Sequence, residues 1–261
     1  MDKISLLSLD GTKKETLNIP QIFQIKPRKD LIQKAVEVTI SKSKQIQGRD
    51  KRAGLRNTAK GWGTGHGMSR APRIKGSGFS TARNVGRVPF AVGGRRTHGI
   101  KVEKNIEKKI NKKEFKNSVY SAISATAKEN WVKDRGHIID NIPFLPLVID
   151  DKIQTIKKTN RIYTILTNLG LKEELDRVKN GKRIRSGKGK RRGRKYKKKK
   201  GVLIIIKEDF GIVQAARNIP GVDITKIENL TINDLAPGGK ASRLVIWTQS
   251  AFNELNTFEG K

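Results

Sequence analysis

Val202-Leu203-Ile204-Ile205-Ile206 is the longest uninterrupted apolar run of the chain, and it decides the fold class. Its length suits a strand, and its isoleucine and valine content favours one. Because all five side chains are apolar, both faces of this strand must be covered, as in the central strands of a parallel sheet. Shorter apolar runs at 147–149, 222–225 and 244–247 predict further strands of the same sheet.

Segments with helical spacing separate these strands. Upstream of the central run, the apolar residues of 162–169, ended by Gly170, and those of 171–178 predict two helices. Downstream of it, 210–218 and 249–255 predict two more. This alternation predicts an α/β fold, with a mostly parallel sheet and flanking helices.

The N-terminal part of the chain adds a strand and two helices. Residues 3–9 predict the strand, and Asp30 can cap a helix whose apolar positions lie on one face. A second helix is expected from near Asn111, which stands three residues before Glu114, as in a capping box. We expect this helix to continue along one apolar stripe, formed by Tyr120, Ile123, Ala127 and Trp131.

Positive charge is concentrated in two stretches that contain no acidic residue. The chain has 261 residues, with 57 Lys+Arg against 24 Asp+Glu and a formal net charge of +33. Residues 51–102 hold 12 basic residues and residues 178–207 hold 15, which together supply 27 of the 33 excess charges. Such a distribution predicts a polyanionic partner, either nucleic acid or an acidic membrane surface.

Neither basic stretch fits an element of the predicted sheet domain. A loop of about 50 residues without secondary structure is rare within a compact domain and is usually functional or disordered. We therefore expect a globular α/β domain made of residues 1–47 and 103–261, with a basic RNA-binding insertion at 179–201. Residues 48–102 would form a long, extended and irregular loop that leaves this domain.

The first stretch combines cations with glycine and aromatic residues. It holds 11 of the 25 glycines, which let a backbone approach RNA closely, and Trp62, Phe79 and Phe90, which can stack on unpaired bases. A disordered basic linker is the alternative, but such linkers seldom carry these aromatic residues. We expect RNA contacts from Arg52, Arg56, Lys60, Arg70, Arg73, Lys75, Arg83, Arg87, Arg95, Arg96 and His98.

The second stretch is denser and has one aromatic residue. Lys179–Lys200 contains 14 basic residues, and a solvated charge run or a localisation signal is the alternative interpretation. Its place between a helix and a central strand favours docking into a groove lined by phosphates. The expected RNA contacts are Arg183, Arg185, Lys188, Lys190, Arg191, Arg192, Arg194, Lys195 and Tyr196.

Other classes of protein find little support in the sequence. There is no cysteine, the three histidines lack ligand spacing, and no apolar run approaches the roughly 20 residues of a membrane span, so we expect no metal, no cofactor and no membrane partner. Gly238-Gly239-Lys240-Ala241 resembles the end of a phosphate-binding loop, but it lacks the upstream glycine and the hydroxyl residue. An RNA-modifying or nucleotide-using α/β enzyme therefore remains only an alternative, as does a polybasic membrane-surface protein.

Several blocks of sequence resemble the family of large-subunit ribosomal protein four, the L-four family. Two blocks of the first stretch are similar to the family's loop and to its archaeal and eukaryotic loop exit, namely Trp62–Arg73 and Val92–His98. In the family, prolines often follow this exit, whereas Gly99 and Ile100 follow it here. The C-terminal half is similar in four further blocks, Gly187–Tyr196, Arg217–Asp223, Leu235–Gly239 and Leu244–Thr248. The end of the chain at Lys261 favours the archaeal type.

The resemblance implies a non-enzymatic, cytoplasmic constituent of the large ribosomal subunit that binds 23S-type rRNA and supports assembly. It implies that the loop tip lines the polypeptide exit tunnel, beside the ribosomal protein L-twenty-two and in the path of the nascent polypeptide. Other neighbouring ribosomal proteins would be partners, and a homo-oligomer is not expected. The implied tip residues are Trp62, Gly63, Thr64, Gly65, His66, Gly67 and Met68.

Overall fold

The computed structural model describes residues 3–257, which fall into two compact units. One unit consists of Met1–Ile40 and Lys108–Lys261, and the other is Ser41–Glu107. These boundaries lie a few residues outside the expected loop, 48–102. No helix of the described residues is both long enough and apolar enough to cross a bilayer.

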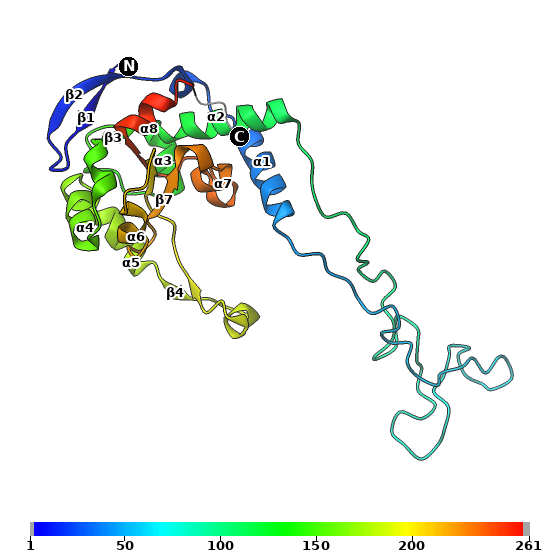
Figure 1. Cartoon of the computed structure of the whole chain (residues 1–261). Helices are drawn as coiled ribbons and strands as arrows, with labels where there is room; N and C mark the ends of the chain where they lie inside the picture. Colours follow the sequence, from blue (N-terminus) through cyan, green and yellow to red (C-terminus); the bar gives the residue numbers. More distant parts are fainter. Residues whose placement is uncertain (1–2, 258–261) are drawn as a thin grey trace. The chain divides into compact units, whose positions relative to one another are not determined.

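The first unit is built around a six-stranded sheet with the order β2-β1-β3-β8-β6-β7 (Figure 1). Every neighbouring pair is parallel except β1 with β2. The α/β class with a mostly parallel sheet is therefore confirmed, as are the strands expected near 147, 203, 223 and 245. The strands are β1 (Lys3–Leu7), β2 (Lys13–Asn18), β3 (Leu147–Ile149), β6 (Leu203–Ile206), β7 (Asp223–Lys226) and β8 (Val245–Thr248).

The strand β6 has the environment that its apolar sequence predicts. It pairs in parallel with β8 on one side and β7 on the other, and its residues are fully buried. Leu203 and Ile205 join one hydrophobic core cluster, whereas Ile204 and Ile206 join another. The alternation of side chains across the sheet therefore supplies both cores.

Helices cover both faces of the sheet (Figure 1). One core lies between the sheet and α4, α5 and α6, and the other includes residues of α1, α2, α7 and α8. Three serines of α2, namely Ser118, Ser121 and Ser124, are buried as well. The helices are α1 (Lys29–Lys42), α2 (Lys112–Thr126), α3 (Glu129–Arg135), α4 (Thr159–Asn168), α5 (Lys172–Asn180), α6 (Ile212–Ala216), α7 (Ile232–Leu235) and α8 (Gln249–Glu254).

Three details of the N-terminal part differ from expectation. The first strand ends at Leu7 rather than at residue 9, and the chain returns as the edge strand β2, which was not predicted because its residues are mostly exposed and polar. The helix α1 begins at Lys29, so Asp30 lies in its first turn instead of capping it. Asn111 occupies the N-cap of α2 but makes no side-chain capping bond.

The apolar stripe expected on a single helix is divided between two. The helix α2 ends at Thr126, and α3 begins at Glu129 after the extended residue Lys128. Tyr120 and Ile123 therefore lie on α2, whereas Trp131 lies on α3. Because the break is only two residues long, the apolar spacing is preserved closely enough that periodicity alone predicts one helix.

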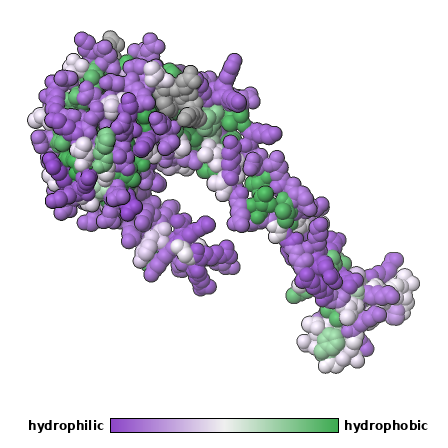
Figure 2. All heavy atoms as spheres, in the orientation of Figure 1, coloured by the Kyte–Doolittle hydropathy of each residue, from purple (hydrophilic) through white to green (hydrophobic). Residues whose placement is uncertain are grey.

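The second basic stretch is a folded hairpin, which the sequence did not predict. Its short strands β4 (Arg183–Ile184) and β5 (Tyr196–Lys197) are antiparallel, and a 3-10 turn, Lys188–Arg192, lies between them. Gly187 and Gly193 flank this turn with φ of 76° and 77°. In Figure 1 the hairpin projects from the body of its unit, and Figure 2 shows it covered by hydrophilic residues.

Beyond Lys42, where α1 ends, the unit Ser41–Glu107 contains neither a helix nor a strand among its described residues. The structure describes all residues of this unit. Backbone hydrogen bonds hold it together instead. The two chain segments at its base approach closely, since the N–H of Arg49 donates to the carbonyl of Ile100 at 3.0 Å. Farther along, a Cβ added to Gly54 would lie 2.5 Å from the backbone of Gly94.

Candidate RNA-binding surfaces

Backbone pairing closes the glycine-rich part of the unit Ser41–Glu107 into a defined loop. Lys60 and Arg73 exchange two hydrogen bonds of 3.0 Å each, and Arg73 forms a second bridge with Val85. The N–H of Gly86 also donates to the carbonyl of Pro72 at 2.8 Å. Three chain segments therefore meet at Arg73, and the expected tip residues lie in the loop that the first bridge closes.

Within that loop, the structure brings together Trp62 and His66. Their ring centroids are 5.4 Å apart with an edge-on geometry, and Trp62 is half-buried while His66 is exposed. Gly63, Gly65 and Gly67 between and beside them have φ of 82°, 88° and 62°, which L side chains rarely adopt. The loop thus presents two aromatic rings on a backbone that only glycine follows without strain, with Thr64 and Met68 exposed.

Three of the arginines expected to bind RNA hold this unit together. Nη1 of Arg73 donates to the carbonyl of Arg83 at 2.9 Å, and Arg87 donates to both the side chain and the carbonyl of Asn57. Arg56 pairs with Asp50 at 2.6 Å. The other expected residues are exposed, namely Arg52, Lys60, Arg70, Lys75, Arg83, Arg95, Arg96 and His98.

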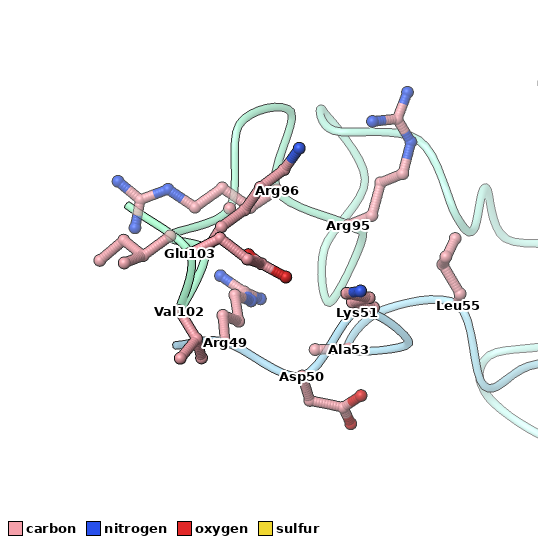
Figure 3. Close-up of a pocket in the computed structure, with 12 residues that line it drawn as sticks. Arg49, Asp50, Lys51, Ala53, Leu55, Arg95, Arg96, Val102 and Glu103 are labelled. Carbon is pink, nitrogen blue, oxygen red and sulfur yellow. The ribbon is translucent and has the colours of Figure 1, made fainter. Parts of the chain in front are cut away.

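A cavity of about 690 Å³ lies at the base of the same unit (Figure 3). One wall comes from residues 49–55 and the other from residues 95–103. Its charged lining is mostly basic, with Arg49, Lys51, Arg95, Arg96 and Lys101 against Asp50 and Glu103. Since Asp50 is already paired with Arg56, the cavity has an excess of positive charge.

The hairpin of the first unit gathers cations around its aromatic residue. Nζ of Lys182 lies 4.5 Å from the centre of the Tyr196 ring, and Nζ of Lys195 lies 5.6 Å from it. Nε of Arg185 donates to the carbonyl of Arg194, which braces the turn. The remaining residues expected to bind RNA are exposed, namely Arg183, Lys188, Lys190, Arg191, Arg192 and Arg194.

A buried arginine, which the sequence analysis missed, anchors the chain that returns from the hairpin. Arg243 is 1% exposed, and its guanidinium donates to the carbonyls of Gly201, Val202 and Gly221. It also pairs with Asp223 at 2.6 Å, and Lys200 pairs with the same carboxylate at 2.7 Å. Burial on its own raises the pKa of Asp223, but these two cations outweigh it and the pKa is lowered.

A second buried network lies beneath the start of the hairpin. Oε1 of Glu174 lies 2.7 Å from Nδ1 of His137 and 2.6 Å from Nη2 of Arg177, and Arg177 also donates to the carbonyl of Lys200. Burial would raise the pKa of Glu174, but the hydrogen bonds from Arg177 and His137 outweigh it, so the pKa is lowered. The pKa of His137 is lowered because burial, aided by the charges of Arg177 and Arg135, outweighs Glu174. This histidine is therefore a neutral packing residue at neutral pH.

A network of hydrogen bonds links protein groups at the carboxyl end of the parallel strands. In such sheets, ligands bind beyond the carboxyl ends of the strands. At this end, Asp151 after β3 accepts hydrogen bonds from the N–H and the hydroxyl of Ser250, at 3.0 and 2.7 Å, and so occupies the N-terminus of α8. Gln154, which is 4% exposed, bonds to Asp151 and to the N–H of Glu208. These side chains of Asp151, Gln154 and Ser250 thus bind one another at the carboxyl end of the sheet.

The turn that resembles the end of a phosphate-binding loop has a structural role. Gly238 and Gly239 have φ of 78° and 83°, and Arg135 donates to the carbonyls of Pro237, Lys240 and Ala241. Burial, with the charges of Arg243 and Arg177, lowers the pKa of Arg135 to about 10. The turn is fastened to α3 through its carbonyls. Among the described residues, no group of His, Cys, Asp and Glu could hold a metal ion.

The fold and these surfaces define a class, an α/β protein with large basic surfaces. Over residues 17–258 the chain matches the family described as "Ribosomal protein L4/L1 family". The chain belongs to this family, and the resemblance noted in its sequence is confirmed. It is accordingly a structural, non-enzymatic constituent of the large subunit of the cytoplasmic ribosome.

Archaeal proteins named "Large ribosomal subunit protein uL4" resemble the chain over nearly its whole length. The protein from Methanopyrus kandleri is 41% identical over 250 residues, which are 96% of this chain and 96% of that protein. The protein from Methanosphaera stadtmanae is 42% identical over 255 residues, covering 98% of this chain and 96% of its own. The protein from Methanocaldococcus jannaschii is 40% identical over 253 residues, covering 97% and 98%.

Proposed function

We propose that the chain binds the large-subunit, 23S-type rRNA through two basic segments and thereby supports assembly of the subunit. The loop of residues 48–102 penetrates the rRNA, and its tip, Trp62–Met68, forms part of the wall of the polypeptide exit tunnel. The insertion of residues 179–201 binds a second site on the rRNA. Neighbouring ribosomal proteins, including L-twenty-two at the tunnel, are the protein partners.

The observation that carries this proposal is the distribution of charge. Two stretches without any acidic residue supply 27 of the 33 excess positive charges, while the rest of the chain has the charge balance of an ordinary domain. Phosphate contacts position a protein on RNA and make its affinity depend steeply on salt. Concentrating the cations in two segments fits contact with a polyanion at these two places.

The two basic segments differ in chemistry, and we infer a division of labour between them. The tip has aromatic residues and glycine but no cation between Lys60 and Arg70, so it contributes little to the electrostatic affinity. The arginines at the loop exit and in the hairpin, by contrast, present exposed guanidinium groups to phosphate oxygens.

Two sets of variants test this division. In the first, Trp62 and His66 are both replaced by alanine, and incorporation into large subunits, measured by sedimentation, should remain at the wild-type level. In the second, Arg95, Arg96, Arg191 and Arg192 are replaced by glutamine, and incorporation should fall. Failure of the wild-type chain to sediment with the large subunit through moderate salt would remove the proposal itself.

The tunnel position has its own test, because the chain lacks cysteine. Thr64→Cys supplies a single thiol in the exposed tip, and a photoactivatable cross-linker on it should capture a nascent polypeptide held on stalled ribosomes. Lys13→Cys, exposed on β2, is the matched control and should capture none. Equal capture from both positions, or capture from position 13 alone, would contradict the proposed place of the tip.

A further inference from the structure

A cavity of about 600 Å³ lies at the root of the hairpin, where residues of the insertion 179–201 meet residues 217–223, to which no RNA contact is assigned above. Its walls are the end of α5, the chain returning from β5 and the turn 217–221 that follows α6. The basic residues of its lining are Lys179, Lys182, Lys198, Lys199, Lys200 and Arg217. All of these side chains are exposed.

The acid that lines this cavity cannot balance these cations. It is Asp223, whose carboxylate already accepts hydrogen bonds from Lys200 at 2.7 Å and from the buried Arg243 at 2.6 Å. Within residues 3–257, Lys179, Lys198, Lys199 and Arg217 form no ion pair. Four cations therefore converge on one concavity without a protein anion, which creates a strongly positive local potential.

Close backbone packing fixes the shape of the cavity. The N–H of Gly201 donates to the carbonyl of Gly221 at 2.9 Å, and a Cβ on Gly221 would lie 2.3 Å from Cγ1 of Val178. A Cβ on Gly181 would lie 2.7 Å from Cδ of Lys199. Gly201 and Gly221 let the returning chain approach the turn 217–221, and Gly181 lets it approach the end of α5. The buried Arg243 binds the carbonyls of both Gly201 and Gly221. The cations are thus presented by a fixed backbone rather than by a free tail.

We propose that this cavity, here called the root socket, is a separate binding site for the phosphodiester backbone of RNA, with Arg217 and Lys179 as its principal ligands. The proposal rests on the proposed function and adds a site to it. Arg217 follows the last residue of α6, and its planar guanidinium can bind two phosphate oxygens at once. A strand of RNA fits a concave site of this kind, whereas a flat acidic bilayer would meet the projecting hairpin first.

The test uses the full-length chain and protein-free large-subunit rRNA. The socket variant carries Lys179→Gln and Arg217→Gln, and the matched control carries Lys3→Gln and Lys13→Gln, two exposed cations on β1 and β2. Affinity is measured by filter binding over a range of KCl concentrations. Each phosphate contact contributes about 0.7–0.9 to the slope of log K against log salt. The socket variant should lose about 1.4–1.8 from that slope, and the control should lose none.

Further measurements distinguish failure of the socket proposal from failure of the proposed function, and RNA from other anions as the ligand. Arg217→Lys in place of Arg217→Gln keeps one of the two charges and should restore about half of the lost slope, about 0.7–0.9. Circular dichroism should show that all variants are folded. Equal slopes for the socket variant and the control would overturn the proposed socket, while RNA binding by the loop 48–102 and the hairpin would stand. A wild-type chain that did not bind rRNA would overturn the proposed function. Polyglutamate and phosphatidylserine vesicles are added as competitors at equal concentration of charge. If either of them displaced RNA more effectively from the wild-type chain than from the socket variant, the assignment to RNA would be wrong.

Discussion

Nη2 of Arg243 lies 2.6 Å from Oδ2 of Asp223, and this ion pair joins the segment just before β8 to the first residue of β7. The arginine has 1% of its surface exposed, and its Nε donates to the carbonyl of Gly201. The same Nη2 also lies 3.2 Å from the carbonyl oxygens of Val202 and Gly221. One side chain thus satisfies backbone groups from the return of the hairpin and from the turn after α6. The buried side chain of Arg243 therefore holds the root of the hairpin against the sheet.

Replacing Arg243 should destabilise the first unit strongly. Arg243→Met removes the side-chain donor of the buried Gly201 carbonyl and leaves the Asp223 carboxylate with Lys200 as its remaining cation. The carbonyls of Val202 and Gly221 keep their backbone donors, the N–H groups of Asp223 and Gly201. A buried acceptor left without its donor costs about 1–3 kcal/mol. Urea unfolding followed by circular dichroism would measure the free energy of unfolding. Arg217→Gln, an exposed arginine of the same region, serves as the control and should change it by at most about 0.5 kcal/mol. A similar small loss for both variants would show that Arg243 is not an anchor.

Stability should fall as the pH drops from 7.5 to 5, because of His137. Its pKa is lowered in the folded protein, so below about pH 6.5 the unfolded chain binds a proton that the folded chain does not. The free energy of unfolding then decreases toward acid, by at most about 1.4 kcal/mol per pH unit for one proton. Glu174, whose pKa is also lowered, adds a further loss only below its unfolded value of about 4.5.

Two variants isolate the contribution of the buried histidine. His137→Gln removes the titrating group, so its stability should change less between pH 7.5 and 5 than that of the wild type. His98→Gln changes an exposed histidine and should keep the wild-type dependence. Thermal unfolding at each pH provides the measurement. An unchanged pH dependence in His137→Gln would assign the effect to other groups.

Gly221 should tolerate alanine much less well than Gly238 does. Both have positive φ, 74° and 78°, so both substitutions introduce backbone strain of about 1–2 kcal/mol. A Cβ on Gly221 would also lie 2.3 Å from Val178, whereas one on Gly238 meets nothing within 4 Å. The midpoint of urea unfolding should therefore shift further for Gly221→Ala. Equal shifts would mean that Val178 moves aside without cost.

In the unit Ser41–Glu107, Gly94 should matter for assembly and Gly61 should not. A Cβ on Gly94 would lie 1.9 Å from the carbonyl oxygen of Val88, so alanine cannot be accommodated without moving the backbone. A Cβ on Gly61 meets nothing within 4 Å. Quantitative mass spectrometry of purified large subunits, after co-expression of wild-type and variant chains, should show depletion of Gly94→Ala and parity for Gly61→Ala. Parity for both variants would show that the close approach of Gly94 to the backbone of Val88 is dispensable for incorporation.

The strongest patterns in the sequence predicted the fold, and the weaker ones failed for physical reasons. The all-apolar run at β6 has few alternatives to a strand covered on both sides, and the structure confirms it. The edge strand β2 has one exposed face and a polar sequence, so its pattern matches a loop as well as a strand. In β4 and β5, cations dominate the composition while backbone pairing determines the hairpin.

The buried ionic groups could not be found from the sequence. Arg243 stands in a short polar interruption before β8 and reads as a surface residue, because only the fold brings Asp223 and three carbonyls to it. Glu174 and His137 are likewise separated along the chain and meet only after α5 has packed. Charge and glycine content did predict which segments would be exposed and basic. They could not show that Arg73 and Arg87 bind their own backbone.

The three glycines at the root of the hairpin have a consequence for how this protein can vary. Gly181, Gly201 and Gly221 bring the chain together at the base of the hairpin, and no residue from 185 to 195, all of which the structure describes, belongs to either hydrophobic core. We therefore expect that the segment between Ile184 and Tyr196 can change in length or sequence while the domain keeps folding. We also expect that a different segment can replace the hairpin at its root while the α/β domain keeps its fold.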